Sequence, residues 1–150
     1  MVKNKGFTLM EVMIVVTVVA IIAAIAYPSY AEHIRKANRT EAKAELLDVA
    51  KKLQRYKVAR FSFQRPDNSF ITLADIGETV PLTIPRQGTA LYTITLTDVT
   101  ANGWTLNAIP INDTTQQLDG GLAMNHRGEK CWEQLTPSCV PDAETNWDGR

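Results

Sequence analysis

The chain of 150 residues has few of the residues on which catalysis and metal binding usually depend. It holds two histidines, His33 and His126, and two cysteines, Cys131 and Cys139. No serine combines with a histidine and an aspartate at a spacing that predicts a catalytic triad. The cysteines lack the short spacing of a zinc knuckle, and a fourth ligand is missing. Residues 119–121, Asp-Gly-Gly, predict a turn rather than a phosphate-binding loop. We therefore expect no enzyme, no cofactor and no metal site.

The net charge of the chain is zero, but the charges are distributed unevenly over three segments. Residues 1–30 carry +1, residues 31–60 carry nine basic against four acidic side chains, and residues 61–150 carry five against eleven. The acidic last segment disfavours strong binding to phosphates. A basic segment joined to an acidic one suits attraction between neighbouring chains. The alternative is a solvated helix face beside an acidic surface.

Long apolar runs are absent except for one near the N-terminus. Residues 12–27 contain no charge, and Thr17 is their only polar side chain. The run from Phe7 to Tyr27 would span about 31 Å as a helix, enough to cross a bilayer core. Lys3 and Lys5 precede it and favour a cytoplasmic N-terminus. A secretory signal would be shorter and would end in a small-x-small cleavage site.

The residues before this run, Gly6-Phe7-Thr8-Leu9-Met10-Glu11, resemble the prepilin motif of type IV pilins and pseudopilins. The resemblance implies that a prepilin peptidase cleaves between Gly6 and Phe7 and that Phe7 is then N-methylated. Residues 1–6 would be the leader and 7–30 a retained helix that serves as membrane span and filament core. The precursor would lie in the bacterial inner membrane with a periplasmic head, before joining a pilus at the cell surface. Its partners would be other pilins and the assembly machinery of the inner membrane.

Glu11 is a carboxylate at the start of an apolar segment, where a charge is costly and usually functional. Cleavage would create a new α-amino group on Phe7, and this amine in one subunit could pair with Glu11 of a neighbour. The resemblance implies this assembly role. The alternative is that Glu11 merely lies at headgroup depth.

Pro28 follows the apolar run and removes one helix hydrogen bond. Many β-branched residues, which are mediocre helix formers, precede it. We expect a helix kink at Pro28 and a preceding stretch that is able to unwind.

Beyond Pro28 an amphipathic helix is expected over about 31–61. Its apolar stripe recurs at steps of three and four residues and comprises Leu46, Val49, Ala50, Leu53 and Tyr56. DNA or membrane binding by its basic face is an alternative to simple solvation. Residues 62–88 are rich in proline and glycine and predict a connecting loop.

Two alternating segments, 91–99 and 104–109, flank an Asn102-Gly103 turn and predict a hairpin. A third strand is expected from Leu122 toward Asn125, with a return that reaches Trp132. The fold class is therefore α+β: a long N-terminal helix packed on an antiparallel sheet of three to four strands. The globular head would cover 31–150, with the sheet and a C-terminal loop in 89–150.

The fuller resemblance is to PilE-like minor pilins. It depends on residues 6–30, on 38–42 (Asn-Arg-Thr-Glu-Ala), on the hairpin at 92–110, and on 121–132. That group often has a cysteine where this chain has Gly120, so the disulfide of the group does not carry over. Cys131 and Cys139 lie close together in a domain expected to be exported, which favours a disulfide between them. Free thiols or a link to another subunit are the alternatives.

The leading hypothesis is a structural, minor subunit of a type IV pilus that supports pilus assembly, twitching motility and DNA uptake. A second hypothesis is a DNA-receptor minor pilin for natural transformation, and a third is a pseudopilin of a type II secretion system. Some PilE-like pilins are DNA receptors, so a DNA role enters by resemblance. The acidic segment predicts that any DNA binding is weak.

Overall fold

The computed structural model describes residues 6–148 and begins with one long helix, α1, Leu9–Arg60. Internal contacts divide the chain into two compact units, 1–36 and 37–150, and α1 contributes to both. Each unit is described by itself below.

In the first unit, α1 starts after Thr8 and carries the apolar run. The side chains of residues 6–30 are all exposed within the chain. By length and composition, this is a helix able to cross a membrane. Pro28 lies inside α1. Its ring removes one backbone donor, and the helix continues on both sides of it. The proposed kink and unwinding at Pro28 stay predictions.

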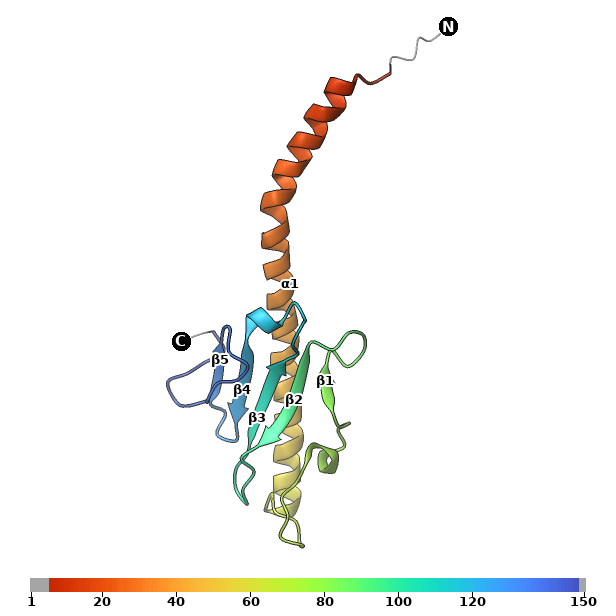
Figure 1. Ribbon diagram of the computed structural model, residues 1–150. Helices are drawn as coiled ribbons and strands as arrows, with labels where there is room; N and C mark the ends of the chain where they lie inside the picture. The colour runs from red at the N-terminus through yellow and green to blue at the C-terminus, as the bar shows by residue number, and fades with distance from the viewer. Residues whose placement is uncertain (1–5, 149–150) are drawn as a thin grey trace. The chain divides into compact units, whose positions relative to one another are not determined.

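The second unit is an antiparallel sheet laid against the rest of α1 (Figure 1). The strands follow one another in space in chain order, and each pairs with the next. Short 3₁₀ helices, η1 (Leu73–Ile76) and η2 (Gln117–Asp119), lie in the connections. The strands are β1 (Leu82–Ile84), β2 (Tyr92–Thr97), β3 (Thr105–Pro110), β4 (Gly121–Asn125) and β5 (Lys130–Glu133).

The core of the second unit forms between the apolar stripe of α1 and one face of the sheet. Leu46, Val49 and Leu53 are fully buried on the helix side. They lie on one face because residues three and four apart meet on one side of a helix. Tyr92 and Leu106 are equally buried on the sheet side. The predicted apolar stripe of α1 therefore packs against the sheet, as expected.

The α+β fold with a long helix on an antiparallel sheet is confirmed, but the sheet has five strands instead of three to four. The additional strand, β1, lies within 62–88, which we expected to be a connecting loop. It is three residues long and is flanked by Pro81 and Pro85, so its alternating pattern is too short to distinguish from a loop. Proline is tolerated there because β1 is an edge strand.

Candidate functional site

The predicted processing and assembly residues lie at the start of α1. Phe7 is 83% exposed, and a Cβ added to Gly6 would meet no atom within 4 Å. The Glu11 carboxylate accepts weak hydrogen bonds from the backbone N–H and the hydroxyl of Thr8, both at 3.4 Å. The Glu11 N–H donates in return to Thr8 Oγ1 at 3.2 Å.

Thr8 and Glu11 therefore form a capping box at the N-terminus of α1, with Thr8 as N-cap and Glu11 three residues on. The expectation for Glu11 omitted this second role, although the Thr-x-x-Glu pattern signals it. Glu11 is also the only charged side chain between Phe7 and Tyr30. Its position thus fits both a helix cap and an ion-pair partner, and the two roles require different experiments.

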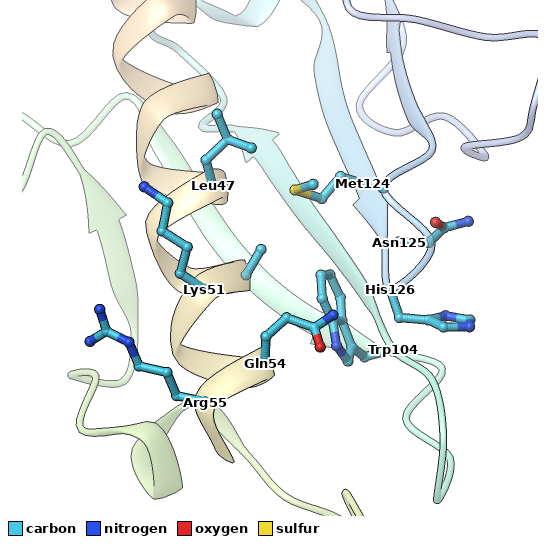
Figure 2. A pocket seen from close by; sticks show the side chains of 10 residues that line it. Leu47, Lys51, Gln54, Arg55, Trp104, Met124, Asn125 and His126 are labelled. Carbon is cyan, nitrogen blue, oxygen red and sulfur yellow. The ribbon is translucent and has the colours of Figure 1, made fainter. Parts of the chain in front are cut away.

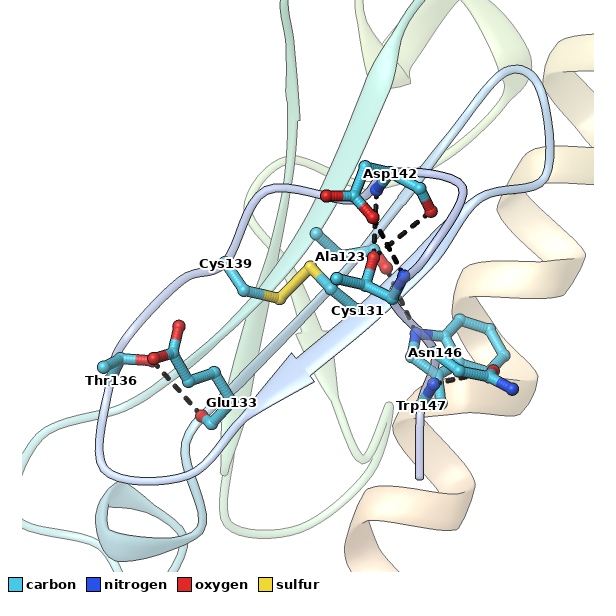
Figure 3. The surroundings of a disulfide bond; sticks show 9 residues. Ala123, Cys131, Glu133, Thr136, Cys139, Asp142, Asn146 and Trp147 are labelled. Atoms are coloured by element: carbon cyan, nitrogen blue, oxygen red, sulfur yellow. Dashed lines mark hydrogen bonds between the residues drawn. A yellow bond between two sulfur atoms is a disulfide. The ribbon is translucent and has the colours of Figure 1, made fainter. Parts of the chain in front are cut away.

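The disulfide Cys131–Cys139 is present, with the two Cα atoms 6.1 Å apart, which confirms the predicted pairing (Figure 3). It closes the loop that follows β5. Gly120 and Gly121 pack directly against this loop: added Cβ atoms would lie 1.9 Å from the Glu133 carbonyl oxygen and 2.1 Å from that of Pro137. The Gly121 N–H also donates to the Thr136 carbonyl. Two glycines are therefore required where the loop meets β4.

A buried polar cluster fastens α1 to the sheet in the second unit. Arg39 donates to the Asp119 carboxylate at 3.0 Å, and its guanidinium lies 3.7 Å from the centre of the Trp132 ring. The same carboxylate accepts the Tyr92 hydroxyl at 3.1 Å and the Gln116 amide at 2.9 Å. Burial, and then the Asp119 carboxylate, raise the pKa of Tyr92, so this hydroxyl stays a donor. These five residues form the α1 clamp.

No local pattern in the sequence predicted the α1 clamp. Arg39 and Asp119 are 80 positions apart, and Asp119 was interpreted only as part of a turn. The one available signal was the stretch 38–42, which carried part of the family resemblance.

Three carboxylates, Glu45, Asp48 and Glu78, lie close enough together to suggest a metal site. Two cations already occupy the cluster: Lys52 pairs with Asp48 and Glu78, and Arg86 pairs with Glu45 and Glu78. A hydrogen bond from Arg86, together with one from Lys52, outweighs burial and lowers the pKa of Glu78. Positive charge is therefore supplied by the chain itself, and the cluster offers no open metal site.

A groove of about 440 Å³ opens between α1 and the ends of β3 and β4 (Figure 2). Its floor is mostly apolar and includes Leu47, Trp104 and Met124. Lys51 and Arg55 stand on the helix side. In the described part of the chain neither of them makes an ion pair within 4 Å. We call this the helix groove.

A long N-terminal helix on an antiparallel sheet, with a C-terminal disulfide loop, is the fold of a type IV pilin. A crystal structure of PilV, a non-core minor pilin of Neisseria meningitidis, has this fold, with a TM-score of 0.51 and 19% identity. The match covers 76% of this chain and 98% of that chain. No curated protein matches the chain.

A family model described as "Type IV minor pilin ComP, DNA uptake sequence receptor" matches residues 28–123, more than half of the chain. A second model, the prokaryotic N-terminal methylation motif, matches residues 1–27. The chain belongs to the ComP family of type IV minor pilins. It is therefore a minor subunit of a type IV pilus with a membrane-anchoring N-terminal helix, as the leading hypothesis predicted.

Proposed function

We propose that this minor pilin is cleaved between Gly6 and Phe7, is N-methylated on Phe7, and enters the pilus through its N-terminal helix and Glu11. The precursor would lie in the bacterial inner membrane with its head in the periplasm, and a prepilin peptidase and the assembly machinery would act on it. The observation that carries the proposal is the single carboxylate in an otherwise uncharged segment from Phe7 to Tyr30.

The assembly role of Glu11 follows from the cost of a charge in an apolar surrounding. Within lipid or a bundle of apolar helices, a carboxylate needs a partner of opposite charge. The new amine of Phe7 on a neighbouring subunit supplies such a charge after cleavage. Thr8, the partner within the chain, donates only weak, uncharged hydrogen bonds.

Two substitutions separate ion pairing from helix capping. Glu11→Gln keeps a side chain that can complete a capping box but removes the charge, whereas Glu11→Ala removes both. We expect both variants to be inserted and cleaved and both to be depleted from sheared pili, measured by quantitative mass spectrometry. Thr8→Ala is the matched control, since it weakens the cap and keeps the charge. Full incorporation of Glu11→Gln would restrict Glu11 to capping and contradict the proposal.

A role in DNA uptake is a second proposed function, with twitching motility as a further consequence of pilus assembly. It is favoured by the family model, whose description names a receptor for a DNA uptake sequence. Four basic side chains near the end of α1 make no ion pair in the described chain: Lys51, Arg55, Lys57 and Arg60. At 100° per residue, Lys51 and Arg55 share a face and Arg60 is about 180° from Lys51. The free cations are therefore dispersed.

We expect duplex DNA to bind the full chain in detergent micelles weakly, in the non-specific range of roughly 10⁻⁴–10⁻⁶ M. With two or three phosphates neutralised, the logarithm of the affinity should fall with a slope of about −2 to −3 against the logarithm of salt concentration. Fluorescence anisotropy between 50 and 200 mM salt measures both values. Submicromolar binding with a steeper slope would instead identify a dedicated DNA receptor.

A further inference from the structure

Two tyrosines lie where the uncharged part of α1 ends. Tyr27 is 76% exposed and Tyr30 is 66% exposed, and neither hydroxyl has a hydrogen bond among the described residues. They are three residues apart, so they lie on one side of the helix, which continues through Pro28. The first charged side chain after them is Glu32, which pairs with Lys36 one turn further on. The two phenol rings therefore lie between an apolar and a charged segment, without a polar partner in the described chain.

This position suits the headgroup layer of a bilayer. An apolar ring with a hydroxyl at its tip is stabilised where hydrocarbon meets water, and tyrosine is enriched at that boundary in membrane proteins. Arg35 and Lys36 follow Tyr30 within two turns of α1. Long basic side chains near the end of a membrane helix extend toward the same layer. The order of apolar, aromatic and charged residues thus matches the order of layers that a helix meets as it leaves a membrane.

The length of the apolar segment determines what lies at its other end. From Leu9, the first residue of α1, to Tyr27 the helix rises about 27 Å. The two residues before Leu9 bring the segment close to the roughly 30 Å of a hydrocarbon core. When Tyr27 lies at one boundary of the core, the Gly6–Phe7 bond therefore lies at the other boundary.

We propose that Tyr27 and Tyr30 bind the headgroup layer on the side of the membrane away from the leader, and that this contact sets the depth at which the Gly6–Phe7 bond is presented for cleavage. The partner of this helix surface in the precursor is thus lipid. The rings contact the boundary between acyl chains and headgroups, and the hydroxyls donate to phosphate or ester oxygens. The inference rests on the proposed membrane location of the precursor.

An apolar helix of another pilin is the competing partner of this surface. Such a neighbour would leave both phenol hydroxyls without an acceptor, which is costly in an apolar surrounding. It would also draw the charged side chains of Glu32 and Lys36, one turn beyond Tyr30, toward the apolar contact. The headgroup layer offers acceptors to the hydroxyls and water to the charges. The tyrosine pair therefore suits lipid better than a packed helix.

The test uses the full precursor in vesicles of phosphatidylethanolamine and phosphatidylglycerol with the head facing outward. A cysteine replaces Ala24, Ala31 or Ala37, and a membrane-impermeant maleimide added outside reports which position lies beyond the hydrocarbon. The native cysteines form the disulfide and do not react. In the wild type, Ala31→Cys and Ala37→Cys should react and Ala24→Cys should be protected. In Y27L/Y30L the boundary should move by about one helical turn, so that Ala31→Cys becomes protected.

Two control variants separate the interfacial role from a general effect of substitution. Y27W/Y30W keeps an aromatic ring and a donor at each position and should keep the wild-type boundary. I21L/I22L changes two side chains inside the apolar run and should keep it as well. A prepilin peptidase reconstituted in the same vesicles should cleave Y27L/Y30L about fivefold more slowly than the other three chains, because realigning a shifted helix has a modest cost.

An unmoved boundary in Y27L/Y30L would overturn the inference, and so would a moved boundary with unchanged cleavage. Loss of Y27L/Y30L from sheared pili, with boundary and cleavage both unchanged, would assign the tyrosines to helix packing in the pilus and overturn it too. Extraction of the wild-type precursor from membranes by alkaline carbonate would instead contradict the proposed membrane location. The tyrosine contact can therefore fail while the proposed location and processing stand.

Discussion

The two parts of helix α1 place apolar side chains in opposite situations. Over residues 12–27 the helix is apolar on every side apart from Thr17, and all of its side chains are exposed within the chain. In the second unit, Leu46, Val49 and Leu53 are fully buried against the sheet. A helix that is apolar all round must be buried in lipid or among other helices. A helix with one apolar stripe needs no further burial once that stripe is covered.

This difference separates assembly from stability along one helix. The first part obtains its burial from other molecules, so changes there should alter processing and incorporation and leave the head folded. The second part obtains its burial from its own chain, so changes there should alter the free energy of unfolding. If the two parts are independent, a change in one part leaves the property of the other part unaltered.

The largest expected effect is on processing. Gly6→Leu should abolish cleavage, because the peptidase of the prepilin family cuts after a glycine and a bulky residue would take its place. Intact-mass analysis of membrane-extracted protein should show the leader retained in the variant and removed in the wild type. The thermal unfolding of the head should be the same for both. An uncut leader in the wild type would contradict the proposed processing.

The α1 clamp should give the largest effect on stability. Asp119→Ala leaves the guanidinium of Arg39, whose side chain is 12% exposed, without its carboxylate, and deprives Tyr92 and Gln116 of an acceptor. Breaking a buried pair on one side typically costs about 3–5 kcal/mol. Urea unfolding followed by tryptophan fluorescence measures the loss. Glu41→Ala, at an exposed carboxylate of α1 that makes no ion pair among the described residues, is the control. A loss below about 1 kcal/mol for Asp119→Ala would exclude the clamp as a main support.

Local patterns predicted most of the fold. The stripe of Leu46, Val49 and Leu53 has helical spacing, and the hairpin of β2 and β3 follows from alternation around Asn102-Gly103. Both signals lie within a short window of sequence. β1 was missed because three residues between prolines carry too little pattern.

Sequence periodicity could not predict contacts between positions that are far apart in the chain. Arg39 and Asp119 meet only after α1 packs on the sheet, and neither has neighbours that indicate burial. The helix groove likewise combines Lys51 with Trp104 through tertiary packing. By contrast, Cys131 and Cys139 were predicted as a pair because only two cysteines exist and they are close in sequence.

Loss of the disulfide should lower the stability of the head by less than loss of the α1 clamp does, and it should leave the N-terminal part of α1 unaffected. Replacing both Cys131 and Cys139 with serine should reduce the free energy of unfolding by roughly 2.5 kcal/mol, from the chain entropy of so short a loop. Helix insertion and cleavage should be unchanged. Thiol titration of the folded wild type without reductant is the complementary measurement. Two reactive thiols per chain, or a dimer that disappears on reduction, would refute the pairing in the mature protein.

The smallest effect concerns Asp75, which caps η1 in the head. Burial of this carboxyl raises its pKa, but hydrogen bonds from Arg65 and Thr72 outweigh burial and hold the pKa at about 2, below the ordinary 3.8. A lowered pKa in the folded state adds stability above the unfolded pKa, and this stability is lost as the pH falls toward 2. Because Asp75 and Arg65 are partly exposed, we expect about 1 kcal/mol at neutral pH.

Asp75→Asn removes the charge and keeps a side chain that can cap η1. Its unfolding free energy should be about 1 kcal/mol below that of the wild type at pH 6, and the gap should close between about pH 4 and pH 2. Urea unfolding at a series of pH values measures this gap, with Asp113→Asn as the control at an exposed site. A gap that persists unchanged at pH 2 would mean that Asp75 acts through its shape alone. If Asp75→Asn also reduced cleavage of the leader or incorporation into pili, the two parts of the chain would be coupled.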